Sequence, residues 1–296
     1  MESQIINNSK RERTELIINN VYTLPVMPEV LSNVLALINN EKTTTSELSR
    51  EISKDQSLVV KILSIANSPY YGLQKIVSSI DFAIMILGYS ELQSIVTALA
   101  ILELLKNKSD KYLDQKEFYI HSYLTGLLAK RIAYDLGYVD SDKAFIAGFI
   151  HDIGISIVHR FMHSSFVRIY EEVQQNNIPM IEAEKNVLGM THEEVAKFLL
   201  NKWNLPDAIS NAVNFHHYPS KSKEDRYLPT IVHISDYLIY KTFGNKYYWD
   251  KDLVFDKEVL DVFRFDSVED VDNFVNNYVL TLIEQANELG AKIEAD

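Results

Sequence analysis

The chain of 296 residues contains no cysteine. This absence excludes disulfide bonds, thiolate metal ligands and cysteine nucleophiles together. Any metal ion must therefore be held by imidazole and carboxylate side chains. A chain without cysteine is also compatible with a reducing compartment, so we expect a cytoplasmic protein.

Glycine and proline are scarce, with 9 and 7 residues respectively. Few turns are therefore marked, and the apolar residues recur at intervals of three and four, as on a helix face. Two stretches, Thr44-x-x-Glu47 and Thr191-x-x-Glu194, have the spacing of N-terminal capping boxes. The pattern predicts an all-α fold with about a dozen helices, including one long amphipathic helix over 267–289.

Long apolar runs are also missing. The longest nearly apolar stretch, Ile95 to Leu102, is closed by Glu103 and is far shorter than the ~18 residues of a bilayer span. The first twenty residues mix charged and apolar side chains, unlike a secretory signal. We therefore expect a soluble chain that is neither exported nor membrane-bound.

Basic residues are the minority, with 29 Lys and Arg against 41 Asp and Glu and a net charge of -12. No basic run is present that could neutralise a phosphate backbone. We therefore expect no binding to a nucleic-acid duplex.

Histidine is concentrated in one part of the chain: none lies in 24–105, and seven of the eight lie in 116–217. His151 and Asp152 are adjacent within the apolar stretch AFIAGFIHDIGISIV, where two ionisable side chains are costly to bury without a partner. A metal ion is one such partner, and five imidazoles and two carboxylates would suffice for one or two metals. The candidate ligands are His121, His151, Asp152, His192, His216, His217 and Asp236.

Spacing alone is weak support for this site, because only the fold could bring such scattered residues together. The alternative for any single histidine is an ordinary core or surface position, and we favour it for His159, His163 and His233. His233 stays a reserve candidate because it precedes Asp236 by three residues on one helix face. His159 and His163 flank the polar run RFMHSS, where we expect an exposed end.

The order His, His-Asp, His, His-His, Asp resembles the metal-ligand series of the HD superfamily, especially its HD-GYP branch. Other stretches resemble the signature of HDOD domains, and together they cover about 24–219. These stretches are LPVMPEVLSNVLALIN, SREISKDQSLVVKILSIANSPYYG, SSIDFAIMILGYSELQSIV, GFIHDIGISIV and HEEVAKFLLNKWNLPDAISNAVNFHHYP.

The resemblance implies a domain order. An N-terminal extension at 1–23 would precede an HDOD domain at 24–219, which comprises a helical subdomain at 24–105 and an HD-like bundle at 116–219. C-terminal helices at 220–296 would complete that bundle.

Two departures from active HD phosphohydrolases bear on function. Those enzymes typically carry a lysine three residues after the aspartate of the His-Asp pair, where this chain has Ile155, so a positive partner for the transition state is missing. The Gly-Tyr-Pro motif of HD-GYP proteins is also absent, because Tyr218-Pro219-Ser220 follows His217. HDOD domains resemble HD enzymes that have become regulatory or scaffolding modules.

We therefore interpret the chain as a signalling module, and we lean against its being an efficient enzyme. It would dock a protein partner or respond to a nucleotide, and a homodimer is compatible with this interpretation. The alternative is a metal-dependent phosphohydrolase acting on a nucleotide or cyclic dinucleotide, with Asp152 as the bridging carboxylate. A third alternative is a purely structural helical protein without metal. The resemblance favours iron, and manganese, zinc or nickel suit the same ligands.

Overall fold

The computed structural model describes residues 2–20, 29–38, 40, 42–67, 71, 73, 76–105, 109–203, 205–251 and 253–294. These residues form fifteen α-helices, short 3-10 helices and no β-strand, which confirms the predicted all-α fold class. The stretch LPVMP at 24–28, part of the motif quoted above, lies outside the described residues.

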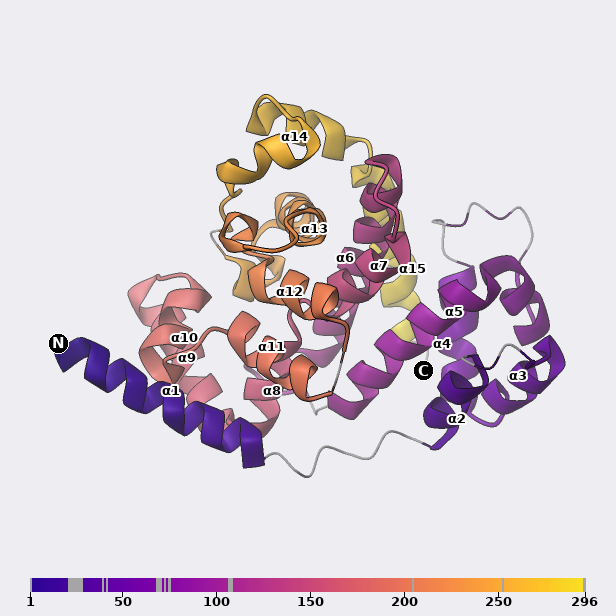
Figure 1. The fold of residues 1–296 in the computed structure, drawn as a ribbon, viewed down its shortest axis with the longest axis horizontal. Coiled ribbons are helices and arrows are strands. Elements are labelled where there is room, and N and C mark those ends of the chain that lie inside the picture. The colour runs from indigo at the N-terminus through magenta and orange to yellow at the C-terminus, as the bar shows by residue number, and fades with distance from the viewer. Residues whose placement is uncertain are drawn as a thin grey trace. The chain divides into compact units, whose positions relative to one another are not determined.

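The chain divides into two compact units, residues 1–24 with 105–279 and residues 25–104 with 280–296. The domain boundaries inferred from the sequence stay predictions. All the candidate metal ligands lie in the first unit, whose helices are labelled in Figure 1. Its helices are α1 (Glu2–Asn20), α6 (Gln115–Asp135), α7 (Ser141–Ile150), α8 (Ile153–Phe161), α9 (His163–Asn176), α10 (Met180–Leu188), α11 (His192–Lys202), α12 (Asp207–Phe215), α13 (Tyr227–Phe243) and α14 (Val268–Asn276).

Helices α6 and α7 pack closely on each other, and α13 packs against both. Asp114 caps the start of α6 by accepting hydrogen bonds from the backbone N–H groups of Lys116 and Glu117. The contact between α6 and α7 is close because Gly148 faces α6: an added Cβ there would lie 2.8 Å from the Thr125 carbonyl oxygen. This close packing brings the inward-facing residues of the two helices within reach of each other.

Helix α1 docks on α10 and α11. The hydroxyl of Thr14 donates to the Leu188 carbonyl at 2.8 Å, and the guanidinium of Arg11 lies 2.7 Å from Glu194. Glu194 also forms a capping box with Thr191 at the start of α11, which confirms the predicted capping box there. The N-terminal helix is therefore attached beside the first turn of α11.

The second unit contains α2 (Glu29–Ile38), α3 (Thr45–Ile52), α4 (Gln56–Ala66), α5 (Ile80–Leu105) and α15 (Val279–Glu294). The predicted capping box of Thr44 and Glu47 opens α3, as expected. Helix α5 is interrupted at Gly88, whose φ of 76° and ψ of 171° are not helical. The core of the second unit is aliphatic and includes Leu48, Ile52, Ile62, Ile84, Leu92 and Ile95.

Two segments among the described residues are long and apolar enough to cross a membrane by length and composition, Ile80–Leu99 and Ser141–Phe161. The second is 83% buried, which is the position of a core element. The first is half buried and contains the break at Gly88, so it is not one continuous helix.

The prediction of one long amphipathic helix over 267–289 is wrong. The structure places α14 at Val268–Asn276 and starts α15 at Val279. The break falls at Asn277 and Tyr278, and α14 ends within the pair Asn276-Asn277. Asparagine side chains compete for backbone hydrogen bonds and favour helix ends.

Candidate metal centre

The fold brings the seven predicted ligands together in the interior of the first unit. Their side chains come from five places: the middle of α6, the α7–α8 junction, the start of α11, the end of α12 and the middle of α13. All seven are buried, with exposures of 5% or less. They are His121 on α6, His151 and Asp152 at the junction, His192 on α11, His216 and His217 after α12, and Asp236 on α13.

One half of the cluster surrounds the Nε2 atom of His121. This atom lies 3.2 Å from Nε2 of His151, 3.2 Å from Oδ2 of Asp152 and 3.5 Å from Oδ1 of Asp236. Ligand atoms bonded to one first-row metal at ~2.1 Å lie ~3 to 3.5 Å apart. These spacings therefore suit a single shared cation.

The other half of the cluster surrounds the second oxygen of Asp152. Its Oδ1 atom lies 3.4 Å from Nε2 of His192 and 3.5 Å from Nε2 of His216. Nε2 of His217 in turn lies 3.2 Å from Nε2 of His192. Asp152 thus presents one oxygen to each half, which is the arrangement of a carboxylate that bridges two metals.

Hydrogen bonds on the far side of the rings orient three imidazoles. Nδ1 of His151 donates to the Gly148 carbonyl at 2.7 Å, and Nδ1 of His216 donates to the Val213 carbonyl at 2.7 Å. Nδ1 of His192 lies 2.9 Å from the buried carboxylate of Glu184. With the proton on Nδ1, each Nε2 presents a lone pair to the cluster, as a metal-ligating histidine does.

Buried polar atoms without a hydrogen-bond partner mark the centre of the cluster. Among the described residues they include both carboxylate oxygens of Asp152, both of Asp236 and Nε2 of His216. Lone pairs that converge without protons between them repel one another, and leaving such groups unpaired in the interior is costly. The cluster therefore has the composition and geometry that suit divalent metal binding.

The electrostatics of the cluster favour added positive charge. Burial lowers the pKa of His151, but the neighbouring Asp152 and Asp236 outweigh it and raise that pKa to about 10. The pKa of Asp152 is pushed up by burial and, more strongly, down by His151 and His121, so that it lies well below its usual range. The carboxylates thus attract either a proton or a metal ion to the same place.

Sequence reasoning missed one further carboxylate, Asp250. It is 2% exposed, and its Oδ2 atom lies 3.5 Å from Nε2 of His121. Burial, together with the charges of Asp236 and Asp152, raises the pKa of Asp250 well above its usual value. An acid that directly follows the aromatic run Tyr247-Tyr248-Trp249 was the only signal in the sequence, and it does not specify a ligand.

The HDOD domain model matches residues 24–219, two thirds of this chain. This chain belongs to the HDOD family. Its fold is similar to that of an HDOD domain protein of unknown function from Geobacter sulfurreducens, with 22% identity, a TM-score of 0.75 and coverage of 94% of this chain and 98% of that one. It is also similar to a structure from Shewanella amazonensis SB2B named as a candidate phosphohydrolase, with 18% identity, a TM-score of 0.70 and coverage of 92% and 97%.

A curated relative from Treponema pallidum (strain Nichols), an uncharacterised protein, is 26% identical over 220 residues. The match covers 73% of this chain and 41% of the length of that relative. The resemblance to HDOD domains inferred from the motifs is therefore confirmed.

His233, the reserve candidate in this HDOD chain, uses both ring nitrogens elsewhere. Its Nδ1 donates to the His216 carbonyl at 2.7 Å, and its Nε2 accepts the backbone N–H of Asp256 at 2.9 Å. It supports the backbone behind a ligand and has no ring nitrogen left for a metal.

Burial of His233 predicts a pH dependence of stability. Burial lowers its pKa from 6.5 to about 4, only partly opposed by the hydrogen bond to His216, so the unfolded chain takes up the proton first as the pH falls. The contribution of His233 is fully present above about pH 6.5 and is lost as the pH falls toward about 4, by about 2 kcal/mol between about pH 7 and about pH 5. Urea unfolding of chelated protein should show a smaller loss over this interval for His233→Gln than for the unchanged chain. Equal losses would contradict the prediction.

His159 and His163 form a separate cluster with Asp110. Nε2 of His159 lies 3.0 Å and Nε2 of His163 lies 2.7 Å from Oδ2 of Asp110. The expectation that both histidines lie at an exposed end is wrong for His159, which is 2% exposed, whereas the side chain of His163 is 51% exposed. The carboxylate of Asp110 also accepts hydrogen bonds from the backbone N–H groups of Tyr112 and Leu113. Hydrogen bonds therefore explain the arrangement of these three side chains without a metal.

We expect His163→Ala and His159→Ala to leave the metal content unchanged, since hydrogen bonding explains both side chains. Elemental analysis of each purified variant, beside the unchanged chain, checks this. His159→Ala should lower the melting temperature more than His163→Ala because it empties a buried position. A loss of one metal per chain in either variant would assign a metal to the Asp110 cluster.

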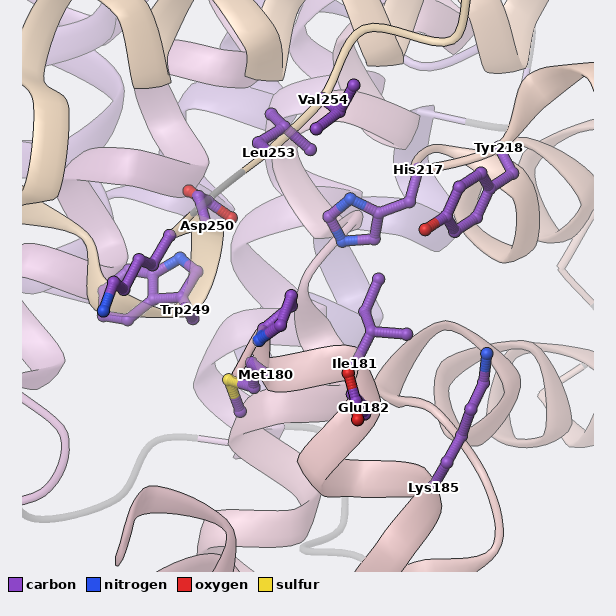
Figure 2. Close-up of a pocket in the computed structure, with 12 residues that line it drawn as sticks. Met180, Ile181, Glu182, Lys185, His217, Tyr218, Trp249, Asp250, Leu253 and Val254 are labelled. Carbon is purple, nitrogen blue, oxygen red and sulfur yellow. The ribbon is translucent and has the colours of Figure 1, made fainter. Parts of the chain in front are cut away.

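A pocket of about 350 Å³ reaches the metal centre from the surface. Figure 2 shows His217 and Asp250 on its wall, with Trp249 beside Asp250. His217 and Asp250 are thus the two members of the cluster that line the pocket. The remaining lining residues are Pro179, Met180, Ile181, Glu182, Lys185, Tyr218, Lys251, Leu253 and Val254.

Proposed function

We propose that this chain is a regulatory HDOD module that holds two divalent metal ions and is not an efficient hydrolase. The observation that carries the proposal is the Asp152 carboxylate, whose two oxygens each face a separate set of buried imidazoles. A divalent ion in each half would compete with protons for these groups and would satisfy both sets at once. We favour iron as the occupant, with manganese, zinc and nickel as alternatives that the same ligands suit.

The residue at the position of the catalytic-branch lysine supports a regulatory rather than a catalytic role. Ile155, at the position of the catalytic-branch lysine, is fully buried. Lys221, which could have replaced that lysine, has its Nζ 3.9 Å from the ring centroid of Tyr218. Lys251 donates to Asn177. Lys185 also lines the pocket, so the regulatory interpretation depends on the missing lysine at position 155 and not on a general lack of positive charge.

The second candidate function is a metal-dependent phosphohydrolase acting on a nucleotide or cyclic dinucleotide. The pocket that reaches His217 favours it, because a phosphate could approach the metal centre there. When bound, two divalent ions would activate water and clamp a phosphate. The chain's part would be to hold the ions through Asp152 and the imidazoles, and to exclude bulk water by burying them.

Two measurements on the purified full chain separate these functions. Elemental analysis without chelator should find about two metals per chain, and a panel of phosphodiesters should be hydrolysed no faster than by Asp152→Ala. Metal-dependent hydrolysis that Asp152→Ala abolishes would establish the phosphohydrolase instead. Absence of metal after growth with supplement would reject the metal centre and place the histidines in the core.

A protein partner or a nucleotide would be the signal for the regulatory module, and a homodimer remains part of the proposal. Binding assays with a nucleotide panel and sedimentation of the metal-loaded chain address these two points.

A further inference from the structure

The carboxylate of Asp250 lies in the metal centre without a counter-charge of its own. Neither of its oxygens has a hydrogen-bond partner among the described residues, although the residue is 2% exposed. Its Oδ2 atom lies 3.5 Å from Nε2 of His121. A buried carboxylate that accepts no hydrogen bond is stable as an anion only beside a cation.

The segment from Gly244 to Lys251 positions the Asp250 side chain in the cluster. It starts at Gly244, with a φ of 59° and ψ of -133° that L side chains rarely adopt, and continues through η3 (Gly244–Lys246) and η4 (Tyr248–Asp250). The rings of Tyr247 and Trp249 pack edge-on against His121, with centroids 4.7 and 5.6 Å from it.

A second anchor holds the other side of the segment. The hydroxyl of Tyr248 donates to the Tyr112 carbonyl at 2.8 Å, and its ring packs on Tyr170 at 5.2 Å. Successive aromatic residues therefore fasten the segment to α6 on one side and to α9 on the other. The carboxylate of Asp250 is positioned by this packing and by the backbone hydrogen bond from its N–H to the Tyr247 carbonyl at 3.2 Å, since the carboxylate oxygens accept no hydrogen bond.

The charge of the cluster is consistent with this placement. Asp152, Asp236 and Asp250 bring three negative charges into one buried site, and two divalent ions would bring four positive ones. A single divalent ion would leave the three carboxylates in excess, which burial disfavours.

We propose that Asp250 is a ligand of the metal ion held by His121 and His151, and that it occupies the coordination position facing the pocket. This inference rests on the proposed metal centre and deepens it. On this side of the cluster, two sets of side chains have ligand atoms close enough to share an ion: His121, His151 and Asp236, and His121, Asp152 and Asp250. On the other side the set is Asp152, His192, His216 and His217. An entering phosphate could bind the second ion beside His217 but would be kept from clamping both, as two-metal hydrolysis requires.

The test compares Asp250→Ala with Glu182→Ala in the full metal-loaded chain. Glu182 lines the same pocket and is solvent-exposed, so its removal takes one negative charge from that wall without touching the cluster. Metal affinity is measured by competition with a chelator, and affinity for inorganic phosphate by titration calorimetry.

We expect Asp250→Ala to weaken the binding of the more loosely held of the two metals by at least ~10-fold. A loss of this size is typical when a residue that holds or orients the ligands of a metal site is removed. With metal at saturation, it should bind phosphate roughly 10-fold more tightly than Glu182→Ala does, the difference of about one charge-assisted contact. Unchanged metal affinity, or a phosphate affinity no higher than that of Glu182→Ala, would overturn the assignment.

A second variant covers the case in which Asp250→Ala does not fold. Asp250→Asn keeps the volume and one ligating oxygen but loses the charge, so metal affinity should fall while the fold is kept. Wild-type metal affinity in Asp250→Asn would overturn the assignment. Rapid diester hydrolysis by the metal-loaded wild type would overturn the proposed function and the closed coordination position, but Asp250 would stay a ligand if Asp250→Ala still bound metal less tightly. A wild type without metal would overturn the proposed function and the ligand assignment together.

Discussion

Replacing Asp152 with alanine is expected to release both metals and to lower the melting temperature in metal-containing buffer by roughly 10 °C. Both halves of the cluster share this carboxylate, so neither keeps its geometry without it. A ligand present at 100 to 1,000 times its dissociation constant stabilises a fold by about 3 to 4 kcal/mol. For a chain of this size that corresponds to roughly 6 to 16 °C. Elemental analysis and thermal unfolding measure the two effects.

Two comparisons make the Asp152→Ala result specific. After chelation, the difference in melting temperature should shrink, because the unchanged chain then loses the same stabilisation. Asp140→Ala removes an exposed partner of Lys143 and should change neither metal content nor stability by more than about 0.5 kcal/mol. A full metal complement in Asp152→Ala would show that the site assignment is wrong.

Gly154→Ala should be nearly as damaging, although position 154 is not a ligand. A Cβ at this position would lie 2.0 Å from the carbonyl oxygen of His192, so the start of α8 and the start of α11 would have to separate. Because Asp152 and His192 stand at these two helix starts, the separation would pull apart two ligands of the same metal position. We expect destabilisation of about 4 kcal/mol or more and loss of metal.

The matched control is Gly137→Ala. Gly137 has a φ of 72° and nothing within 4 Å of an added Cβ, so alanine there brings backbone strain without a clash. The expected cost is about 1 kcal/mol, with metal content unchanged. Wild-type stability and metal content in Gly154→Ala would mean that the close approach of α8 to α11 is not required.

The order of histidines and aspartates in the sequence was sufficient to predict which seven residues meet, because that order could be matched to a known ligand series. The helix starts at Thr44 and Thr191 were predictable because a capping box is local chemistry. Asp250 was not predictable, since its place depends on how Tyr247 and Trp249 pack against His121. Packing between distant segments leaves no periodic or local trace in a sequence.

The burial of His159 was missed for a related reason. A polar run such as RFMHSS indicates exposure on average, but the partner that allows burial, Asp110, lies in a turn 49 residues away. The pairing of such distant groups can be read only from the fold. His163, on the same run, is the one that faces solvent.

The positions of His151 and His216 have a consequence for how the metal centre assembles. Each is the C-cap of its helix, α7 or α12, and each donates Nδ1–H to the carbonyl three residues earlier. The last carbonyls of a helix lack partners within the helix. The imidazoles that would hold the metals therefore also terminate two helices, and folding alone aims their free nitrogens inward. The ordering of these two side chains is a cost of folding and not of metal binding, so an incoming ion meets ligands that are already in place.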